Sequence, residues 1–260
     1  MRRRPFLALL SALGLLALGL PAAADTLADI KAAGVLRVAV PQDFPPFGSA
    51  GLDMTPMGYD IDMANVIAER LGVKAELTAV TSANRVPYLQ TDRVDLVISS
   101  LGRNAERELV IDFSDAYAPF YNGIFGDADL ELADVAGLDG KSVGVTRGSV
   151  EDLALTEMAP DGAAINRYED NNGTISAFLS GQVDVIATGN VVAAAIIERN
   201  PPRTPELKFL VKNSPCYIGL NKNEPELLAA VNGIIAEMKA DGSLNALSQK
   251  WLHADLPADL

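Results

Sequence analysis

The sequence predicts an α/β protein that is divided into two similarly built lobes. Apolar segments of strand length alternate with segments of helical periodicity, which is typical of parallel βαβ units. One stretch also occurs twice in similar form: the run from Tyr88 to Ile98 resembles the run from Phe178 to Ala187. In both, a helix ends, a polar turn follows, and a "Val-Asp" pair opens an apolar strand. Two copies of one supersecondary unit indicate two lobes of similar construction.

The first half of the chain predicts three strands and a long helix. Val35–Val40 reads as a strand, and Asp60–Leu71 reads as a helix because its apolar residues recur at helical spacing. Gly72 follows directly, as is common just past a helix end. Lys74–Val80 and Val94–Ser99 are the next two strands, with a short helix between them.

The alternation resumes after Gly123 and ends in a helical C-terminal part. The expected strands are Ser142–Val145, Ala164–Tyr168 and Val183–Ala187. The expected helices are Ser149–Met158, Asn172–Ser180, Glu224–Ala240 and Ser243–Trp251.

Two extended segments are predicted to cross between the lobes. Asp115–Asn122 is rich in aromatic residues and contains Pro119, and Ser214–Gly219 supplies the return crossing. The first lobe is therefore discontinuous and is expected at 25–117 and 219–260. The second lobe is expected at 123–212, and the hinge crossings at 118–122 and 213–218.

The N-terminus has the pattern of a cleaved secretory signal. Three arginines after Met1 precede the uncharged apolar run Phe6–Leu20, and Ala22–Ala24 supplies small residues before Asp25. The apolar run is shorter than the ~20 residues that span a bilayer. We therefore expect a signal peptide at 1–24, cleavage before Asp25, and a free mature protein in the periplasm.

Composition excludes several classes of function. The formal net charge is −13, with 34 acidic against 21 basic residues. Such a chain is disfavoured as a partner of nucleic acid or of anionic lipid. Cys216 and His253 are the sole residues of their types, so the sequence predicts neither a disulfide nor a metal site. We expect no cofactor, and we expect Cys216 to be a small buried hydrophobic residue.

The motifs along the mature chain resemble those of the polar amino-acid solute-binding proteins of ABC transporters. The motifs that carry this resemblance are "GVLRVAV" with "DFPPF" (34–47), "GYDIDMANVIAERLG" (58–72), "DLVISSLGRNAER" (95–107), "IDFSDAY" (111–117), "GKSVGVTRGS" (140–149), "GQVDVIAT" (181–188) and "GSLNALSQKW" (242–251). The resemblance implies the two-lobed type II periplasmic binding fold with two hinge-crossing strands.

Polar residues that could bind an anion follow a buried strand of the first lobe. Ser99, Ser100 and Gly102 lie where the chain leaves the carboxyl edge of the sheet, the usual ligand side of open α/β folds. Asn104 is a candidate N-cap for a short helix that carries Arg107. On residues alone, Arg107 could equally pair with an acid such as Glu106 or Asp112.

The resemblance implies that Arg107 clamps a ligand α-carboxylate. It also places Phe44 as the aromatic wall of the cleft, and Ser100 and Gly102 as polar partners of the ligand. Arg107→Ala is therefore expected to remove most ligand affinity, because it deletes a charge-assisted bidentate contact.

The second lobe offers a helix start at the sequence Arg147-Gly148-Ser149. Ser149 is an N-cap candidate, and the acidic pair Glu151-Asp152 suits the positive end of a helix dipole. This arrangement could be a capped helix without any ligand. The resemblance implies carboxylate contacts here, to which Val150 could contribute only its backbone N–H.

The chain departs from the family pattern at Gly189. The resemblance implies an aspartate there that receives the ligand's α-ammonium, and this chain has glycine. Either Glu151, Glu169 or Asp170 replaces that acid, or the ligand lacks a conventional α-ammonium.

Arginines near the predicted cleft favour an anionic ligand. Arg85 lies where acidic-amino-acid binders of the family carry an arginine that reads the side chain, and Arg103 and Arg147 lie on cleft-edge turns. Each could also be a solvated surface residue. Together they make a dicarboxylate the leading hypothesis.

These observations predict a monomeric receptor that closes on a small carboxylate-bearing ligand and then docks on a membrane ABC permease. The expected ligand is amino-acid-like, and an acidic amino acid falls within this class. The alternative is a secreted dehydratase-like enzyme on the same fold, with Glu151 as general acid. No nucleophile–base pair supports turnover, so the sequence favours a protein that is not an enzyme.

Overall fold

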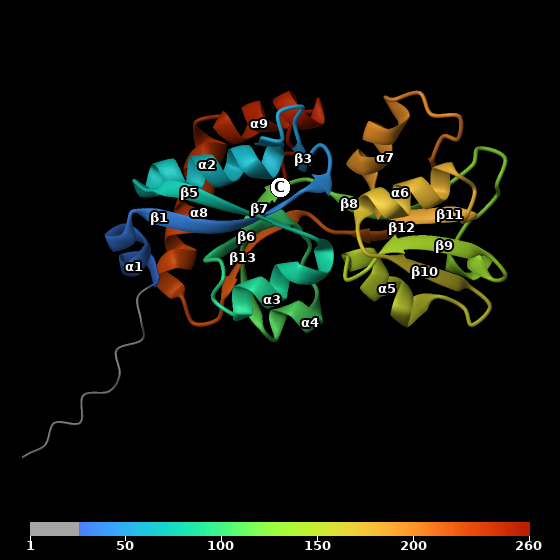
Figure 1. Ribbon diagram of the computed structural model, residues 1–260, viewed down its shortest axis with the longest axis horizontal. Coiled ribbons are helices and arrows are strands. Elements are labelled where there is room, and N and C mark those ends of the chain that lie inside the picture. Colours follow the sequence, from blue (N-terminus) through green and yellow to red (C-terminus); the bar gives the residue numbers. More distant parts are fainter. Residues whose placement is uncertain (1–25) are drawn as a thin grey trace, which may run out of the picture.

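The computed structural model describes residues 26–260, which form two lobes side by side (Figure 1). Each lobe contains a five-stranded mixed sheet with helices above and below it. The strand order is β5-β1-β6-β13-β7 in the first lobe and β10-β9-β11-β8-β12 in the second. The predicted two-lobed α/β fold is confirmed, while the predicted signal peptide and its cleavage site lie outside the described residues.

The first lobe combines the N-terminal part of the chain with its C-terminal part. Its elements are α1 (Thr26–Ala33), β1 (Val35–Pro41), β2 (Asp43–Phe44), β3 (Gly48–Ala50), β4 (Pro56–Met57), α2 (Tyr59–Leu71), β5 (Lys74–Val80), the 3₁₀ turn η1 (Ser82–Asn84), α3 (Arg85–Gln90), β6 (Leu96–Leu101), α4 (Ala105–Glu108), β7 (Ile111–Ala118), β13 (Cys216–Asn221), α8 (Pro225–Ala240) and α9 (Ser243–Leu252). As predicted, Gly72 ends α2, in the left-handed conformation with φ 77°.

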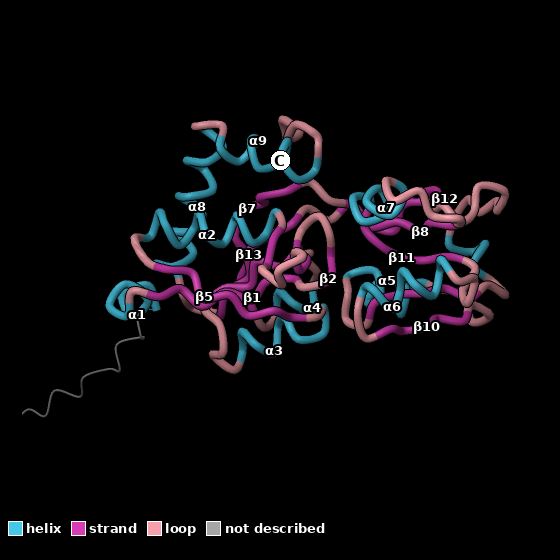
Figure 2. The backbone as a smooth tube through the Cα atoms, turned by 45° about the horizontal axis from the view of Figure 1, so that its top comes forward, coloured by secondary structure: helices cyan, strands magenta, loops and turns pink. Residues whose placement is uncertain are grey.

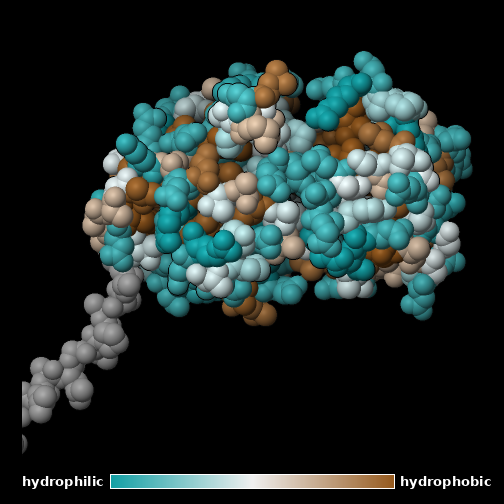
Figure 3. All heavy atoms as spheres, in the orientation of Figure 1, coloured by the Kyte–Doolittle hydropathy of each residue, from teal (hydrophilic) through white to brown (hydrophobic). Residues whose placement is uncertain are grey.

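The second lobe is built from the middle of the chain. Its elements are β8 (Tyr121–Gly126), the 3₁₀ turn η2 (Val135–Leu138), β9 (Ser142–Thr146), α5 (Val150–Met158), β10 (Ala164–Tyr168), α6 (Asn171–Leu179), β11 (Val185–Gly189), α7 (Asn190–Ile197) and β12 (Glu206–Asn213). The sequence did not predict α7, which is apolar almost throughout. Its buried residues face the lobe, whereas Ile197 is 42% exposed, and apolar atoms show on the face at this helix (Figure 3).

The internal sequence repeat has a structural cause. Asp95 and Asp184 each precede a buried strand, and each carboxylate accepts a hydrogen bond from a backbone N–H of the neighbouring strand, from Arg37 of β1 at 2.8 Å and from Ser142 of β9 at 2.7 Å. The aspartate of each "Val-Asp" pair therefore ties its strand to the neighbouring strand through its side chain, ahead of the regular backbone pairing. This is why β6 and β11 begin two residues later than predicted.

The chain passes between the sheets twice, at Pro119–Phe120 and at Ser214–Pro215. The backbone N–H of Ser214 donates to the carbonyl of Phe120 at 3.0 Å, so the two crossings lie side by side. Figure 2 shows the strands gathered inside each lobe and the narrow connection between the lobes. The predicted lobe boundaries remain a prediction.

Aromatic residues fill the junction of the lobes. The ring of Phe120 lies 6.0 Å from that of Phe44 and 5.6 Å from that of Phe47, measured between centroids. Phe47 in turn contacts Tyr59, which packs on Tyr117. Burying each such ring stabilises the fold by about 1.5–3 kcal/mol. The cluster therefore forms a well-packed wall of the cavity described below.

Candidate functional site

A narrow cavity lies between the lobes. Its walls come from both lobes and from both crossings: Phe44, Ser82, Arg85, Ser100, Gly102, Phe120, Asn122, Ser149, Val150, Glu151, Asn171 and Ser214. The free space in this conformation is about 10 Å³, room for roughly one water molecule. A larger ligand therefore enters only when the lobes move apart.

Three buried oxygens in this cavity have no hydrogen-bond partner among the described residues. They are Ser100 Oγ, Asn122 Oδ1 and Ser214 Oγ. Leaving a buried polar group unpaired costs about 1–3 kcal/mol, and such groups are rare in folded proteins. Their convergence on one cavity indicates a site built for a polar ligand.

Ser100 is positioned by a buried carboxylate. Its backbone has φ 41°, and its N–H donates to Asp60 Oδ2 at 2.6 Å. The other oxygen of Asp60 accepts a hydrogen bond from the Tyr117 hydroxyl at 2.6 Å. Burial raises the pKa of Asp60 to about 7. Asp60 thus fixes the backbone bend at Ser100, near the end of β6, which places Ser100 in the cavity wall. This role of Asp60 was not predicted from the sequence.

Arg85 is the cation in the cavity wall. It begins α3, is buried, and donates from Nε to Ser99 Oγ at 3.1 Å. It forms no ion pair within the part of the chain that the structure describes, and Nη1 and Nη2 have no protein partner there. Burial lowers the pKa of Arg85, against the attraction of Asp60, Glu151 and Asp43. Both terminal nitrogens of this buried guanidinium are therefore free to donate to an anion.

Arg107 lies behind the cavity wall and links the lobes. Its Nη1 donates to the carbonyl of Gly102 at 2.7 Å, and its Nη2 donates to the carbonyl of Gly148 in the second lobe at 2.9 Å. Burial lowers the pKa of Arg107 to about 10. Asn104 caps its helix as expected, and neither Glu106 nor Asp112 forms an ion pair with it. Its contact with a ligand carboxylate stays a prediction.

The start of α5 brings two residues against the first lobe. Ser149 caps the helix by accepting from the N–H of Asp152 at 3.2 Å. A Cβ at Gly102 would come within 2.5 Å of Val150 and of Ser214. Glycine at position 102 therefore permits the close approach of the lobes.

Glu151 is the acid in the cavity wall. Its side chain is buried, and its Oε2 accepts a hydrogen bond from Asn122 Nδ2 at 2.8 Å. Burial raises the pKa of Glu151 to about 7, against the attraction of Arg85 and Arg107. The cavity thus carries a cation from the first lobe and a titrating acid from the second.

Gly189 lies beneath an aromatic ring and does not line the cavity. A Cβ built at this position would overlap the ring of Phe120. The space beside the glycine is therefore occupied by Phe120, which packs on Phe44. An acidic side chain cannot be accommodated there without moving this ring.

Several residues predicted near the cleft lie outside the cavity. Arg147 pairs with Glu169 on the exposed surface at 2.9 Å, and Arg103 pairs with Glu108. Asp170 caps α6 by accepting from the N–H of Gly173. These side chains are occupied elsewhere, so Arg103 and Arg147 do not support a second ligand carboxylate, and Arg85 alone of the three arginines lines the cavity.

Five of the lining residues were not predicted from the sequence: Ser82, Phe120, Asn122, Asn171 and Ser214. Three of them belong to the crossings or to the strand that follows the first crossing. Asn171 links the lobes, because its N–H donates to Asp43 Oδ2 at 2.6 Å. The sequence offered one indication of three of them. Residues in the predicted crossings are expected to lie between the lobes and therefore close to a ligand bound there.

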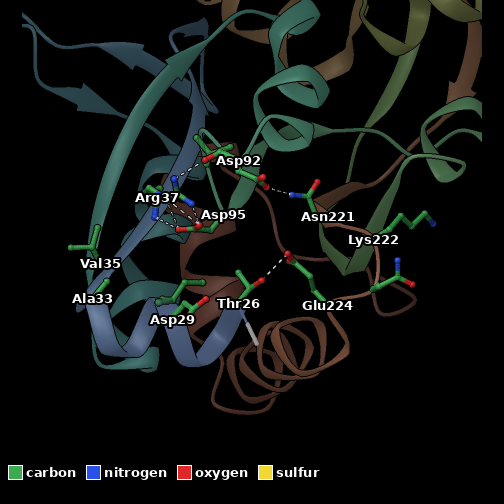
Figure 4. Close-up of a pocket in the computed structure, with 13 residues that line it drawn as sticks. Thr26, Asp29, Ala33, Val35, Arg37, Asp92, Asp95, Asn221, Lys222 and Glu224 are labelled. Atoms are coloured by element: carbon green, nitrogen blue, oxygen red, sulfur yellow. Dashed lines mark hydrogen bonds and ion pairs between the residues drawn. The ribbon is translucent and has the colours of Figure 1, made fainter. Parts of the chain in front are cut away.

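A larger surface cavity, of about 590 Å³, lies at the outer end of the first lobe (Figure 4). Its polar groups are mostly paired with one another: Arg37 with Asp95, and Thr26 with Glu224 at 2.9 Å. Glu224 Oε2 is the one buried side-chain oxygen here without a partner among the described residues, so this cavity lacks the three converging unpaired oxygens of the cavity between the lobes. Within residues 26–260, no cluster of three potential metal ligands occurs.

The architecture and the polar cavity between the lobes define a solute-binding protein of the type II periplasmic fold. The chain belongs to the bacterial extracellular solute-binding proteins, family 3, whose family model matches residues 36–254. In the described part of the chain, no helix has the length and apolar character needed to cross a membrane.

Known relatives are similar over most of their length. The L-cystine-binding protein TcyJ of Escherichia coli strain K12 is 29% identical over 233 residues, 87% of this chain and 86% of that protein. An ancestral arginine-binding protein bound to arginine has a TM-score of 0.79 and 32% identity, over 84% of this chain and 98% of that one. The ancestral amino acid-binding protein AncCDT-1, a precursor of cyclohexadienyl dehydratase, has a TM-score of 0.79 and 31% identity, over 87% of this chain and 99% of that one.

Proposed function

We propose that this chain is the periplasmic binding component of an ABC uptake system and that it closes its two lobes on a small amino-acid-like carboxylate. The single observation that carries the proposal is the set of unpaired oxygens on Ser100, Asn122 and Ser214, which surround a cavity with the free guanidinium edge of Arg85. A carboxylate accepts from a guanidinium in strong charge-assisted bonds.

Closure follows from where these groups lie. Arg85 and Ser100 belong to the first lobe, Glu151 to the second, and Ser214 to a crossing. A ligand that contacts all of them interacts fully only with the closed form, so it shifts the open–closed equilibrium toward closure. The closed form then docks on the membrane permease. The relatives named for binding cystine and arginine support an amino acid as the ligand.

A thermal-shift screen tests this function on the purified mature protein. The compounds are the protein L-amino acids, L-cystine and dicarboxylates such as succinate. A ligand at about 100 times its Kd stabilises the native state by about 2.7 kcal/mol, so at least one amino acid is expected to raise the melting temperature clearly. A flat response to every amino acid and dicarboxylate contradicts the proposal.

A dehydratase is the second candidate, because Glu151 is a buried acid in the cavity with a pKa near 7. A group with that pKa can donate a proton at neutral pH. One similar structure is named as a precursor of cyclohexadienyl dehydratase. Incubation with cyclohexadienyl carboxylates, followed by mass spectrometry for loss of water, separates the candidates: turnover that disappears in Glu151→Gln favours the enzyme.

A further inference from the structure

We propose that Glu151 and Asn122 form the receptor for the ligand's ammonium group, opposite Arg85, so that the cavity selects a zwitterionic amino acid. This inference rests on the proposed binding function and names its ligand class. It moves the ammonium contact from the position of Gly189 to the start of α5.

Asn122 and Glu151 are joined by a hydrogen bond, and acceptors remain on both side chains. Its Nδ2 donates to Glu151 Oε2 at 2.8 Å, while its own Oδ1 is buried without a partner among the described residues. Both Asn122 and Glu151 are nine-tenths buried or more. An ammonium supplies three N–H donors, enough to bond both the carboxylate of Glu151 and the amide oxygen of Asn122.

The charges of the cavity select a molecule that carries both signs. Arg85 and Glu151 come from opposite lobes, and neither forms an ion pair within the described chain. Burying a charge without a partner is costly. A zwitterion neutralises both groups, whereas a dicarboxylate would place a second anion beside Glu151.

The other places for an ammonium receptor are closed. Phe120 fills the space beside Gly189. Glu169 pairs with Arg147 on the surface, and Asp170 caps α6. Of the three acids considered in the sequence, Glu151 alone lines the cavity.

Calorimetry on wild type and on two variants tests the inference. The probes are L-arginine, L-glutamine, L-histidine and L-cystine, together with the N-acetyl form of each, in which the amine is uncharged. Glu151→Gln keeps the shape of the side chain, and Glu169→Gln is the matched control on the surface. We expect Glu151→Gln to weaken binding of the free amino acid about 10- to 100-fold, Glu169→Gln to stay within about twofold, and the N-acetyl forms to bind wild type at least about tenfold more weakly.

Proton release gives an independent readout. An ammonium binds the ionised form of Glu151, so binding at pH 7 releases about half a proton, and affinity falls about tenfold per pH unit below 7. Arg85 and Arg107 face Glu151 and stay positive, Asp43 is held by Asn171, and Asp60 titrates in the same range. The pH profile of Glu151→Gln is therefore the reference, and it is expected to lack the release due to Glu151.

The outcomes separate this inference from the proposed function. If the N-acetyl acids bind wild type as tightly as the free amino acids, or if Glu151→Gln binds like wild type, the ammonium receptor is refuted while carboxylate binding stands. If wild type binds neither set of probes and no compound of the thermal-shift screen, both the receptor and the proposed function are wrong. The comparison of N-acetyl with free acids needs no variant, so a folding defect cannot obscure it.

Discussion

Replacing Arg85 with alanine is expected to weaken amino-acid binding by about 100-fold or more. The substitution removes a guanidinium that lines a cavity with unpaired oxygens and whose Nη1 and Nη2 have no partner among residues 26–260. Each hydrogen bond to a charged group contributes about 1.5–3 kcal/mol, and about 1.4 kcal/mol corresponds to a factor of ten. Isothermal titration calorimetry with the amino acid found by the screen measures the loss.

Two further variants make this result specific. Arg147→Ala removes an exposed arginine that is paired with Glu169, so its affinity is expected to stay within about twofold of wild type. Arg85→Lys keeps the charge without the planar fork of donors, and an intermediate loss is expected. Binding of Arg85→Ala within a few-fold of wild type, with the fold intact by circular dichroism, would mean that another residue holds the carboxylate, with Arg107 first in line.

Adding a side chain at Gly189 is expected to destabilise the protein and not to create an amino-acid site. From sequence alone, Gly189→Asp is expected to improve binding of ordinary L-amino acids. The structure revises that hypothesis, because a Cβ at this position would overlap Phe120. Overpacking of a core costs about 1–3 kcal/mol, and Gly189→Asp also buries a carboxylate. Urea unfolding is expected to show that the free energy of unfolding falls by at least about 1 kcal/mol for both Gly189→Ala and Gly189→Asp.

A double-mutant cycle identifies the cause of that loss. Phe120→Ala is itself destabilising by about 3–5 kcal/mol, because it removes a buried ring. In that background the ring is gone, and Gly189→Ala is expected to cost less than about 0.5 kcal/mol more. Equal costs of Gly189→Ala with and without Phe120 would show that the glycine is required for another reason.

Most of the fold could be predicted because its signals are local. Helical spacing with Gly72 predicted α2 to within one residue, and the alternation of strands and helices predicted the two sheets. The starts of β6 and β11 were misplaced because Asp95 and Asp184 bond to neighbouring strands, a contact between distant segments. The apolar helix α7 has no strong periodic signal, and β12 is half-exposed and forms by antiparallel pairing with β8, a contact between segments far apart in the chain.

The candidate site was less accessible to sequence reasoning, since residues from several segments meet there. Ser100 and Glu151 could be proposed from strand ends and helix starts. Asn122 and Ser214 could not, because their place in the wall depends on how the two crossings lie against each other. The need for glycine at position 189 comes from its contact with Phe120, about seventy residues away in the chain. A single sequence does not show such a contact.

Small-angle X-ray scattering tests the central claim, closure of the lobes on a ligand, most directly. Scattering is recorded on the mature protein alone and with a saturating concentration of the amino acid that the screen identifies. We expect a smaller radius of gyration with ligand for wild type, and no change for Arg85→Ala at the same concentration. A radius of gyration that is identical with and without ligand, in a sample that calorimetry shows to be saturated, would contradict it.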